Sequence, residues 1–220
     1  MKPQPLPPAE PLRRPRGRPR KAPDAIDEGN RRQELLRVAA RLFRHKGFAA
    51  TTTRDIAAAA GMQSGSPFYH FDSKAALLFA VMEQGMRTAL QRQARALESM
   101  LVRPAEVTPD ALLRTLVRAH FDILLGPGSD FVPVMLYEWR WLTPAHRGAI
   151  AALQRDYEGA WAGALAALQK AGRLQADARV ARLMFLGALN WSVQWYKPKK
   201  GTSLDELTEI AMQLFVPLRP

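Results

Sequence analysis

Apolar side chains recur along most of this chain at the three- and four-residue spacing that places them on one face of an α-helix. No stretch of the sequence alternates polar and β-branched apolar residues in the manner of a half-buried β-strand. Capping residues, prolines and glycines divide the pattern into about nine segments. We therefore expect an all-α fold.

Start and stop signals give the expected bounds of these helices. Gly47 closes the first apolar stripe, and residues 52–55 have the spacing of a capping box at the start of the next helix. Proline follows a threonine at the expected starts of two later helices, where its fixed φ suits the first turn. The predicted helices cover residues 31–47, 54–60, 65–71, 73–101, 109–125, 131–142, 144–171, 177–196 and 203–217.

The N-terminal segment differs from the rest of the chain. Residues 1–23 hold eight of the seventeen prolines and show no apolar period, so we expect a disordered basic arm over residues 1–25. Its sequence RGRP at residues 16–19 resembles an AT-hook, in which Arg16 and Arg18 would follow the minor groove of A·T-rich DNA. A generic basic tail that binds DNA without sequence preference is the alternative.

Two short helices around Gly61 predict a helix-turn-helix, whose second member is free to enter a major groove. The residues TTRDIA at 52–57, Gly61, and GSPFYHFDSK at 65–74 closely resemble the DNA-binding domain of TetR-type transcriptional repressors. The resemblance covers about residues 30–80. It implies a helix-turn-helix domain, expected at residues 26–75, followed by a ligand-binding and dimerisation domain at 76–220.

The DNA-contacting residues follow from helix ends and from this resemblance. Hydroxyls at a helix N-terminus meet phosphate, and the exposed start of the third helix meets base edges. Phe68 stands where the family commonly has tyrosine, so packing replaces a hydroxyl contact there. For His70, a half-buried structural role is the alternative. The candidates are Arg16, Arg18, Thr52, Thr53, Arg54, Gln63, Ser64, Gly65, Ser66, Phe68, Tyr69, His70 and Lys74.

The charge balance favours a polyanionic partner. The chain has 32 Lys and Arg against 20 Asp and Glu, a formal net charge of +12. Nucleic acid is favoured over a membrane surface, because the basic cluster lies in a proline-rich arm without an amphipathic helix. The longest uncharged apolar stretch, residues 183–196, is too short to span a bilayer, and the N-terminus lacks the apolar region of a signal peptide. We expect a cytoplasmic protein.

The sequence carries no catalytic or metal-binding pattern. It has no cysteine, its four histidines are far apart, and it lacks the nucleophile elbow, the P-loop and the Rossmann fingerprint. Most acidic residues have structural explanations, at helix starts or in a pair along a helix such as Arg155 with Glu158. We therefore expect no enzymatic activity, no cofactor and no metal site.

All five tryptophans lie in the C-terminal part, where an aromatic stripe is more often core than ligand site. The helix predicted over residues 177–196 is apolar nearly all round, so it must be covered on more than one side. A two-fold-related copy supplies the second cover. The TetR resemblance likewise implies a dimer interface on the last two helices. The candidate interface residues are Leu183, Leu186, Leu189, Trp195 and Leu214.

The segments YEWR at 137–140 and GALNWSVQWY at 187–196 resemble a branch of TetR-type regulators that respond to acyl-CoA thioesters. This implies an apolar cavity for the acyl chain and arginines for the CoA phosphates. Candidates for the acyl chain are Trp139, Asn190 and Trp191. Candidates for the phosphates are Arg140, Arg147 and Arg182, and for each arginine a solvated helix face or a surface salt bridge is the alternative.

Together these patterns predict a ligand-responsive transcriptional regulator. It is expected to bind a palindromic double-stranded DNA operator as a homodimer, to repress, and to be released by a small hydrophobic effector, with acyl-CoA thioesters as the candidate class. Two alternatives stay open: a TetR-type regulator that senses a hydrophobic compound without CoA, and an architectural protein for A·T-rich DNA. The large aromatic C-terminal part favours a regulator over an architectural protein.

Overall fold

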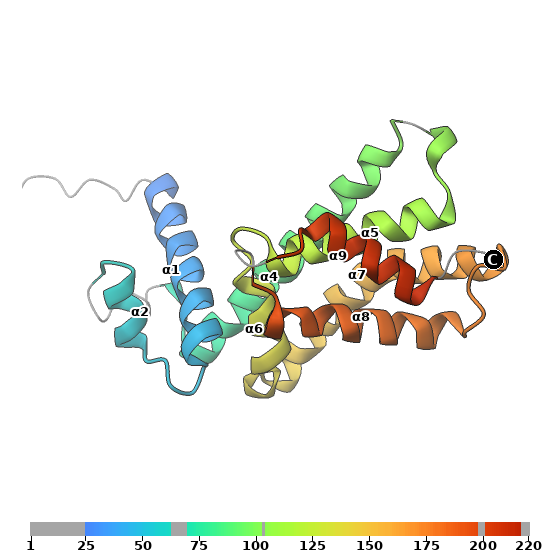
Figure 1. Ribbon diagram of the computed structural model, residues 1–220. Helices are drawn as coiled ribbons and strands as arrows, with labels where there is room; N and C mark the ends of the chain where they lie inside the picture. The colour runs from blue at the N-terminus through green and yellow to red at the C-terminus, as the bar shows by residue number, and fades with distance from the viewer. Residues whose placement is uncertain (1–24, 63–69, 103, 198–200, 217–220) are drawn as a thin grey trace, which may run out of the picture.

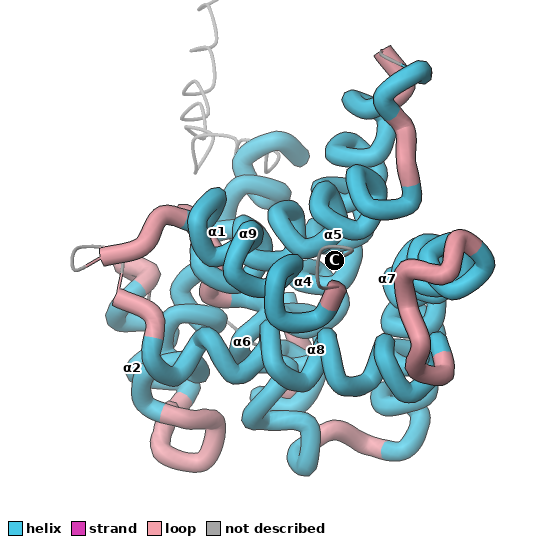
Figure 2. Tube along the Cα trace, turned by 45° about the vertical axis from the view of Figure 1, so that its right-hand side comes forward, coloured by secondary structure: helices cyan, strands magenta, loops and turns pink. Residues whose placement is uncertain are grey.

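The computed structural model describes residues 25–62, 70–102, 104–197 and 201–216 (Figure 1). These residues form eight α-helices and two short 3₁₀-helices, and no strand occurs among them (Figure 2). The α-helices are α1 (Ala25–Lys46), α2 (Thr53–Ala59), α4 (Lys74–Met100), α5 (Pro109–Leu125), α6 (Phe131–Glu138), α7 (Pro144–Lys170), α8 (Ala178–Trp195) and α9 (Leu204–Phe215). The 3₁₀-helices are Pro104–Glu106 and Trp139–Trp141. The prediction of an all-α fold is confirmed.

Two predicted segments lie outside the described residues. The helix expected over residues 65–71 is described only at His70 and Phe71, and the basic arm expected over 1–25 only at Ala25. Candidates in these segments are therefore not placed by the structure. They are Arg16, Arg18, Gln63, Ser64, Gly65, Ser66, Phe68 and Tyr69.

Two helices differ from their predicted bounds. α1 begins at Ala25, before the expected start at Arg31. The helix expected over 131–142 ends at Glu138 and continues as a 3₁₀ turn over Trp139–Trp141. Leu142 and Thr143 are both extended, with ψ 145° and 160°, so the chain leaves helical geometry before the proline that starts α7.

Side-chain caps fix the starts of the later helices as the sequence predicts. The hydroxyls of Ser73, Thr108 and Thr143 each accept a hydrogen bond from the backbone amide three residues further on, at α4, α5 and α7. Ser203 and Glu206 form a complete capping box at α9, and the Ser203 amide that donates to the Glu206 carboxylate lowers the pKa of that group. Each cap satisfies amides that a first helical turn leaves without a partner.

The long helix α4 joins the two ends of the molecule. In Figure 1, α1 and α2 lie at one end, and α4 runs from them into a bundle formed with α5 to α9. α1 packs against both α4 and α6, and one hydrophobic cluster continues from Leu35 in α1 through Leu78 in α4 to Trp161 in α7. We call α1, α2 and the segment up to Ser73 the N-terminal module. Because it shares its core with the bundle, a displacement of α4 or α6 reaches it directly.

Close packing of α4 against α6 depends on Gly85. A Cβ atom placed there would lie 3.0 Å from the Cβ of Phe131 and 3.2 Å from its carbonyl carbon, at the start of α6. The carbonyl carbon is a backbone atom and the Cβ is bonded directly to the backbone, so no side-chain rotation can move either of them away. The glycine therefore sets the distance between these two helices.

We expect Gly85→Ala to be less stable than the matched helix substitution Gly163→Ala by about 1–3 kcal/mol, because the added methyl overpacks the α4–α6 contact. A Cβ at Gly163 in α7 meets nothing within 4 Å, so that change should be neutral or stabilising through helix propensity alone. Urea unfolding of both variants measures the difference. Equal stability of the two would show that α4 and α6 are not in close contact at Gly85.

Candidate nucleic-acid interface and effector cavity

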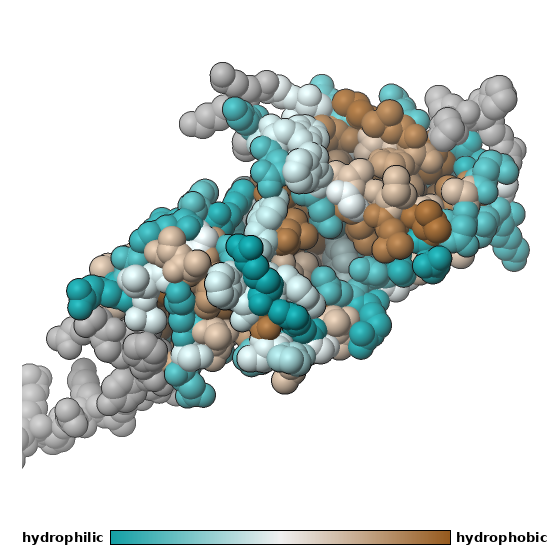
Figure 3. All heavy atoms as spheres, turned by 90° about the horizontal axis from the view of Figure 1, so that it is seen from below, coloured by the Kyte–Doolittle hydropathy of each residue, from teal (hydrophilic) through white to brown (hydrophobic). Residues whose placement is uncertain are grey.

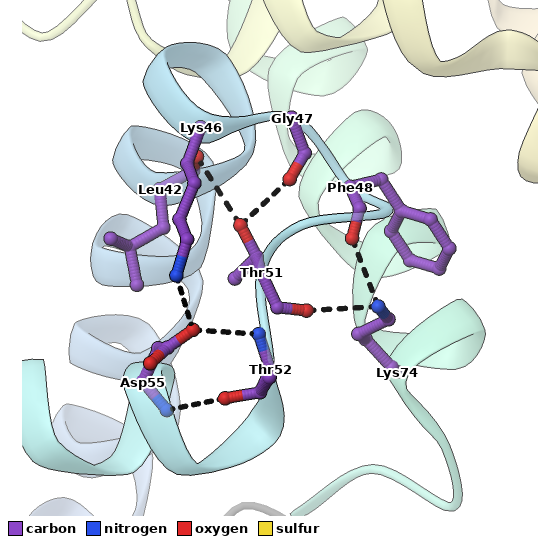
Figure 4. A network of polar contacts seen from close by, with 8 residues as sticks. All are labelled: Leu42, Lys46, Gly47, Phe48, Thr51, Thr52, Asp55 and Lys74. Atoms are coloured by element: carbon purple, nitrogen blue, oxygen red, sulfur yellow. Dashed lines mark hydrogen bonds and ion pairs between the residues drawn. The ribbon is translucent and has the colours of Figure 1, made fainter.

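The start of α2 is held by a capping box (Figure 4). The Thr52 hydroxyl accepts from the Asp55 amide at 3.0 Å, and the Asp55 carboxylate accepts from the Thr52 amide at 2.9 Å. Lys46, at the end of α1, donates to the same carboxylate at 2.7 Å. These hydrogen bonds, the one from Lys46 first, lower the pKa of Asp55 to about 2. The N-terminus of α2 is thereby fixed against α1.

Lys74 anchors the loop between α1 and α2. Its ammonium donates to the carbonyls of Phe48 at 2.9 Å and Thr51 at 2.8 Å, and lies 4.3 Å from the centroid of the Phe48 ring (Figure 4). The buried hydroxyl of Thr51 donates to the Gly47 carbonyl at 2.7 Å. Since an ammonium has three donors, two are committed to the loop and one is left for another acceptor.

The described DNA candidates lie at the start of α2 and in the segment that leads into α4. Thr52 and Arg54 are exposed, whereas Thr53, His70 and Lys74 are partly buried. A helix N-terminus that exposes a threonine and an arginine is a combination suited to phosphate. Phe71 is buried in the core. Contact of Lys74 with DNA stays a prediction, and the structure adds the two hydrogen bonds from its ammonium to the loop.

The end of α1 is tied to α6 and its flanking turns by polar contacts. The backbone amide of Phe48 donates to a carboxyl oxygen of Glu138 at 3.1 Å, and Glu138 is only 7% exposed. The Phe48 ring lies 5.4 Å from that of Trp141. At the other end of α6, Arg44 forms an ion pair of 2.9 Å with Asp130. Sequence reasoning missed these contacts, because they join residues about 90 positions apart.

A small cavity lies inside the bundle between α4, α5, α6, α7 and α8. It has a volume of about 70 Å³, well below the several hundred Å³ usual for ligand pockets. Most of its wall is apolar, and one side carries polar groups. The lining residues are Met86, Ala89, His120, Ile123, Val132, Met135, Leu136, Gln154, Tyr157, Glu158, Leu186 and Asn190.

The polar side of the cavity is a hydrogen-bonded chain centred on His120. Its Nδ1 lies 2.8 Å from the Tyr157 hydroxyl and its Nε2 lies 3.1 Å from Oδ1 of Asn190. Burial lowers the pKa of His120 to about 4, against the raising effect of the Asn190 hydrogen bond, and burial raises the pKa of Tyr157. A neutral imidazole has one N–H. Because Oδ1 of Asn190 can only accept, we assign that proton to Nε2, and the Tyr157 hydroxyl then donates to Nδ1.

Gln93 and Trp161 support this chain from behind. The Gln93 amide donates to the Tyr157 carbonyl at 3.0 Å and accepts from the Trp161 indole at 3.2 Å. Both side chains are buried, and the Trp161 ring meets His120 edge-on at 5.5 Å. With its oxygen held by His120, Asn190 keeps its amide N–H groups for an acceptor in the cavity. The sequence pattern did not single out His120 or Tyr157, since their partners come from other helices.

The six predicted ligand residues do not lie in one place. Asn190 lines the cavity, and Arg182 forms an ion pair of 3.4 Å with Glu158, which also lines it. The expected pairing of Glu158 with Arg155 is wrong, because Glu158 faces α8 and meets Arg182 there. Trp191 is 64% exposed, since it follows Asn190 by one helical step and points outward.

The remaining three predicted ligand residues lie around the turn after α6, outside the cavity wall. Trp139 is partly buried against the core. The Arg140 guanidinium lies 5.5 Å from the Trp141 ring centroid, and Arg147 donates to the Arg140 carbonyl at 2.9 Å. These contacts hold the turn together and do not reach the cavity.

The outer side of α8 and α9 is an exposed apolar face. Figure 3 shows hydrophobic side chains gathered on one side of the C-terminal half. Leu186 and Leu189, predicted for a dimer interface, instead point inward, Leu186 to the cavity and Leu189 to the core, because they lie on the opposite face of α8. The large exposed side chains of this apolar face are Val180, Leu183, Met184, Trp191, Trp195, Ile210 and Leu214.

The described part of the chain contains neither a membrane-spanning helix nor a cluster of metal-binding side chains. No helix there has the length and apolarity needed to cross a membrane. Within the same residues, no group of three or more His, Asp or Glu side chains is placed to hold a metal ion.

Two family models match this chain one after the other. Residues 35–81 match the model for bacterial regulatory proteins of the tetR family, and residues 106–218 match that for the tetracyclin repressor-like C-terminal domain. This chain belongs to the TetR family. TetR-family proteins are DNA-binding transcriptional regulators and not enzymes, which confirms the predicted class.

Relatives of this TetR-family chain resemble it over most of its length. The HTH-type transcriptional repressor KstR2 of Rhodococcus jostii (strain RHA1) is 30% identical over 194 residues, which cover 87% of this chain and 92% of that protein. The solved structure of AibR in complex with isovaleryl coenzyme A and operator DNA is 27% identical, with a TM-score of 0.72 over 85% of this chain and 98% of that one. The structure of superantigen PfiT is 34% identical, with a TM-score of 0.70 over 86% and 98%.

We expect Lys74→Ala to lower the free energy of unfolding by about 1–2 kcal/mol, because the charged hydrogen bonds to the Phe48 and Thr51 carbonyls are lost. It should also weaken binding to specific and non-specific DNA alike, since the α2 N-terminus loses its support. Arg54→Ala, at an exposed position of α2, is the control and should leave stability within about 0.5 kcal/mol. Unchanged stability of the Lys74 variant would contradict the anchoring role.

The neutral state of His120 predicts a pH dependence. Between about pH 6.5 and pH 4 the unfolded chain takes up a proton that the buried imidazole refuses, so His120 makes stability fall as the pH falls. His120→Gln keeps a donor and an acceptor and removes the titration. We compare the free energies of unfolding of wild type and variant. As the pH falls through this window, the value for wild type should fall relative to that of the variant by up to ~1.4 kcal/mol per pH unit. A constant gap in urea unfolding at pH 7 and pH 4.5 would contradict a buried neutral histidine.

Proposed function

We propose that this TetR-family regulator represses by binding a palindromic operator as a homodimer, and that an acyl-CoA thioester releases it. The observation that carries the proposal is the cavity between α4, α5, α6, α7 and α8, because two of its wall helices, α4 and α6, also pack against α1 of the N-terminal module. KstR2 is a transcriptional repressor by name, and the AibR complex contains isovaleryl coenzyme A together with operator DNA. Both support the proposal at the level of ligand class and mode of action.

A second copy of this chain is the proposed cover for the apolar face of α8 and α9. Large apolar patches are uncommon on monomers, and side chains such as Trp191 and Leu214, 64% and 74% exposed, are costly to leave in water. A two-fold arrangement through this face presents two N-terminal modules to DNA. Two recognition helices about 34–36 Å apart then read half-sites one helical turn apart.

The route from cavity to DNA runs through α4 and α6. Met86 and Ala89 on α4 line the cavity, and so do Val132 and Met135 on α6. An effector larger than the present 70 Å³ must push these helices apart. Movement of α6 displaces Glu138 from the amide of Phe48 and so shifts the loop before α2. A coupling of about 1–3 kcal/mol suffices, because half-site spacing is strict.

The test is fluorescence anisotropy of the full chain on the DNA upstream of its own gene, at two salt concentrations, with and without a mixture of medium- and long-chain acyl-CoAs. We expect tight binding that the acyl-CoAs release. Binding that persists in their presence would leave the regulator and exclude this effector class. Weak binding that is equal on any DNA would favour an architectural protein.

A matched pair of variants separates the two halves of the proposal. Arg54→Ala should weaken operator binding without altering acyl-CoA binding. Ala89→Val occupies part of the cavity without exceeding its volume, and it should keep operator binding while it blunts release, because Ala89 is buried in the cavity wall. Release that is as complete in Ala89→Val as in wild type would place the effector outside this cavity.

A further inference from the structure

Four arginines line one groove between α4 and α5. Arg92 and Arg95 come from the last third of α4, and Arg114 and Arg118 from the facing part of α5. The groove has a volume of about 590 Å³ and also contains the side chains of Ser99 and Thr115. Among its lining residues Asp122 is the one carboxylate. The groove therefore has a clear excess of positive charge.

The ion pairs of these arginines leave them available to a stronger partner. Arg92 meets Asp122 at 3.3 Å with both side chains more than a third exposed. Arg114 and Arg118 are paired on their far side, at 2.7 Å with Glu209 and 2.5 Å with Asp205 of α9. Arg95 is exposed and makes no ion pair with any described residue. Exposed pairs of this kind contribute about 0–1 kcal/mol each, so a phosphate group can displace them.

The arginine groove and the effector cavity border a common narrow space. This space, of about 20 Å³, lies between α4, the end of α5 and the start of α6, and it shares Ala89, Ile123 and Val132 with the cavity wall. The same space is bordered by Arg92, which also lines the groove. Cavity, narrow space and groove are thus neighbours along α4, which contributes wall residues to all three.

This succession fits a ligand with an apolar end and a phosphorylated end. The apolar cavity, with the free amide donors of Asn190, takes an acyl group and its carbonyl, while the groove is large enough for a nucleotide. Guanidinium groups bind phosphate through paired hydrogen bonds. The arginines predicted from sequence are engaged elsewhere: Arg182 with Glu158, and Arg147 with the Arg140 carbonyl.

Resting on the proposed function, we infer that the groove between α4 and α5 binds the phosphorylated nucleotide portion of the acyl-CoA effector. The acyl end then lies in the cavity beside His120 and Asn190, and the connecting chain passes Ala89 and Arg92. The nucleotide portion then binds to residues of α4, the helix that leads directly to the N-terminal module (Figure 1).

The test compares two double variants of the full chain. Arg92→Gln/Arg95→Gln removes charge from the groove, and Arg140→Gln/Arg147→Gln removes charge from the turn after α6. Isothermal titration with isovaleryl-CoA, decanoyl-CoA, free CoA and ADP gives the affinities. We expect the groove variant to bind the thioesters about 10-fold or more weakly, with a loss that shrinks at high salt, and the control variant to stay within about two-fold. Retained operator binding by both variants verifies that they fold.

The outcomes separate this inference from the proposed function. Thioesters that bind wild type and groove variant equally would overturn the groove assignment and leave the effector class intact. ADP and CoA that bind through the groove arginines, with no gain from an acyl chain, would make the groove an independent nucleotide site and overturn the assignment of a thioester tail. Absence of binding for all four compounds would overturn both proposals.

Discussion

The buried carboxyl group of Glu138 ties the two parts of the molecule together. It lies at the end of α6 and accepts the amide of Phe48, the first residue after the glycine that closes α1. A buried acceptor that loses its donor costs about 1–3 kcal/mol, so α6 and the loop after α1 must keep their relative position or incur that cost. Lys74 then carries the constraint onward, because its ammonium binds the carbonyls of Phe48 and Thr51 next to the α2 cap. The orientation of α2 thus depends on where α6 lies.

The same helix forms part of the cavity wall, so the cavity and the contacts that hold α1 share a structural element. Val132, Met135 and Leu136 face the cavity from α6, while Asp130 and Glu138 at its two ends hold α1. α6 is only eight residues long, so the residues that face the cavity and those that hold α1 lie within about two helical turns of each other. On the opposite wall the Tyr157 hydroxyl, the His120 ring and the Asn190 side-chain oxygen are linked by hydrogen bonds, and Gln93 supports them from behind. One side of the cavity is therefore held by hydrogen bonds within the bundle, and the other belongs to the helix that contacts α1.

Much of the fold could be predicted from the sequence because its signals are local. Caps such as Thr52 with Asp55 act within three residues, and Pro109 and Pro144 mark helix starts through their own backbone geometry. The cavity could not be predicted, because His120, Tyr157 and Asn190 meet only after three helices pack. A helical step of one residue also separated Asn190, which lines the cavity, from Trp191, which is exposed. Sequence similarity placed both in one motif, and only packing distinguishes their directions.

The small volume of the cavity has a consequence for the sensitivity of this regulator. A ligand that enters a space of 70 Å³ must do work against the packing of Met86, Val132 and Met135 before its own contacts form. Under the proposed release by an effector, that work is subtracted from the intrinsic affinity, so the effector concentration that releases the operator depends on core packing as well as on ligand contacts. Substitutions that add or remove one methyl group in the core, at side chains that never touch DNA, can then change this effector concentration in small steps. The dose response can thus be adjusted gradually while the operator stays the same.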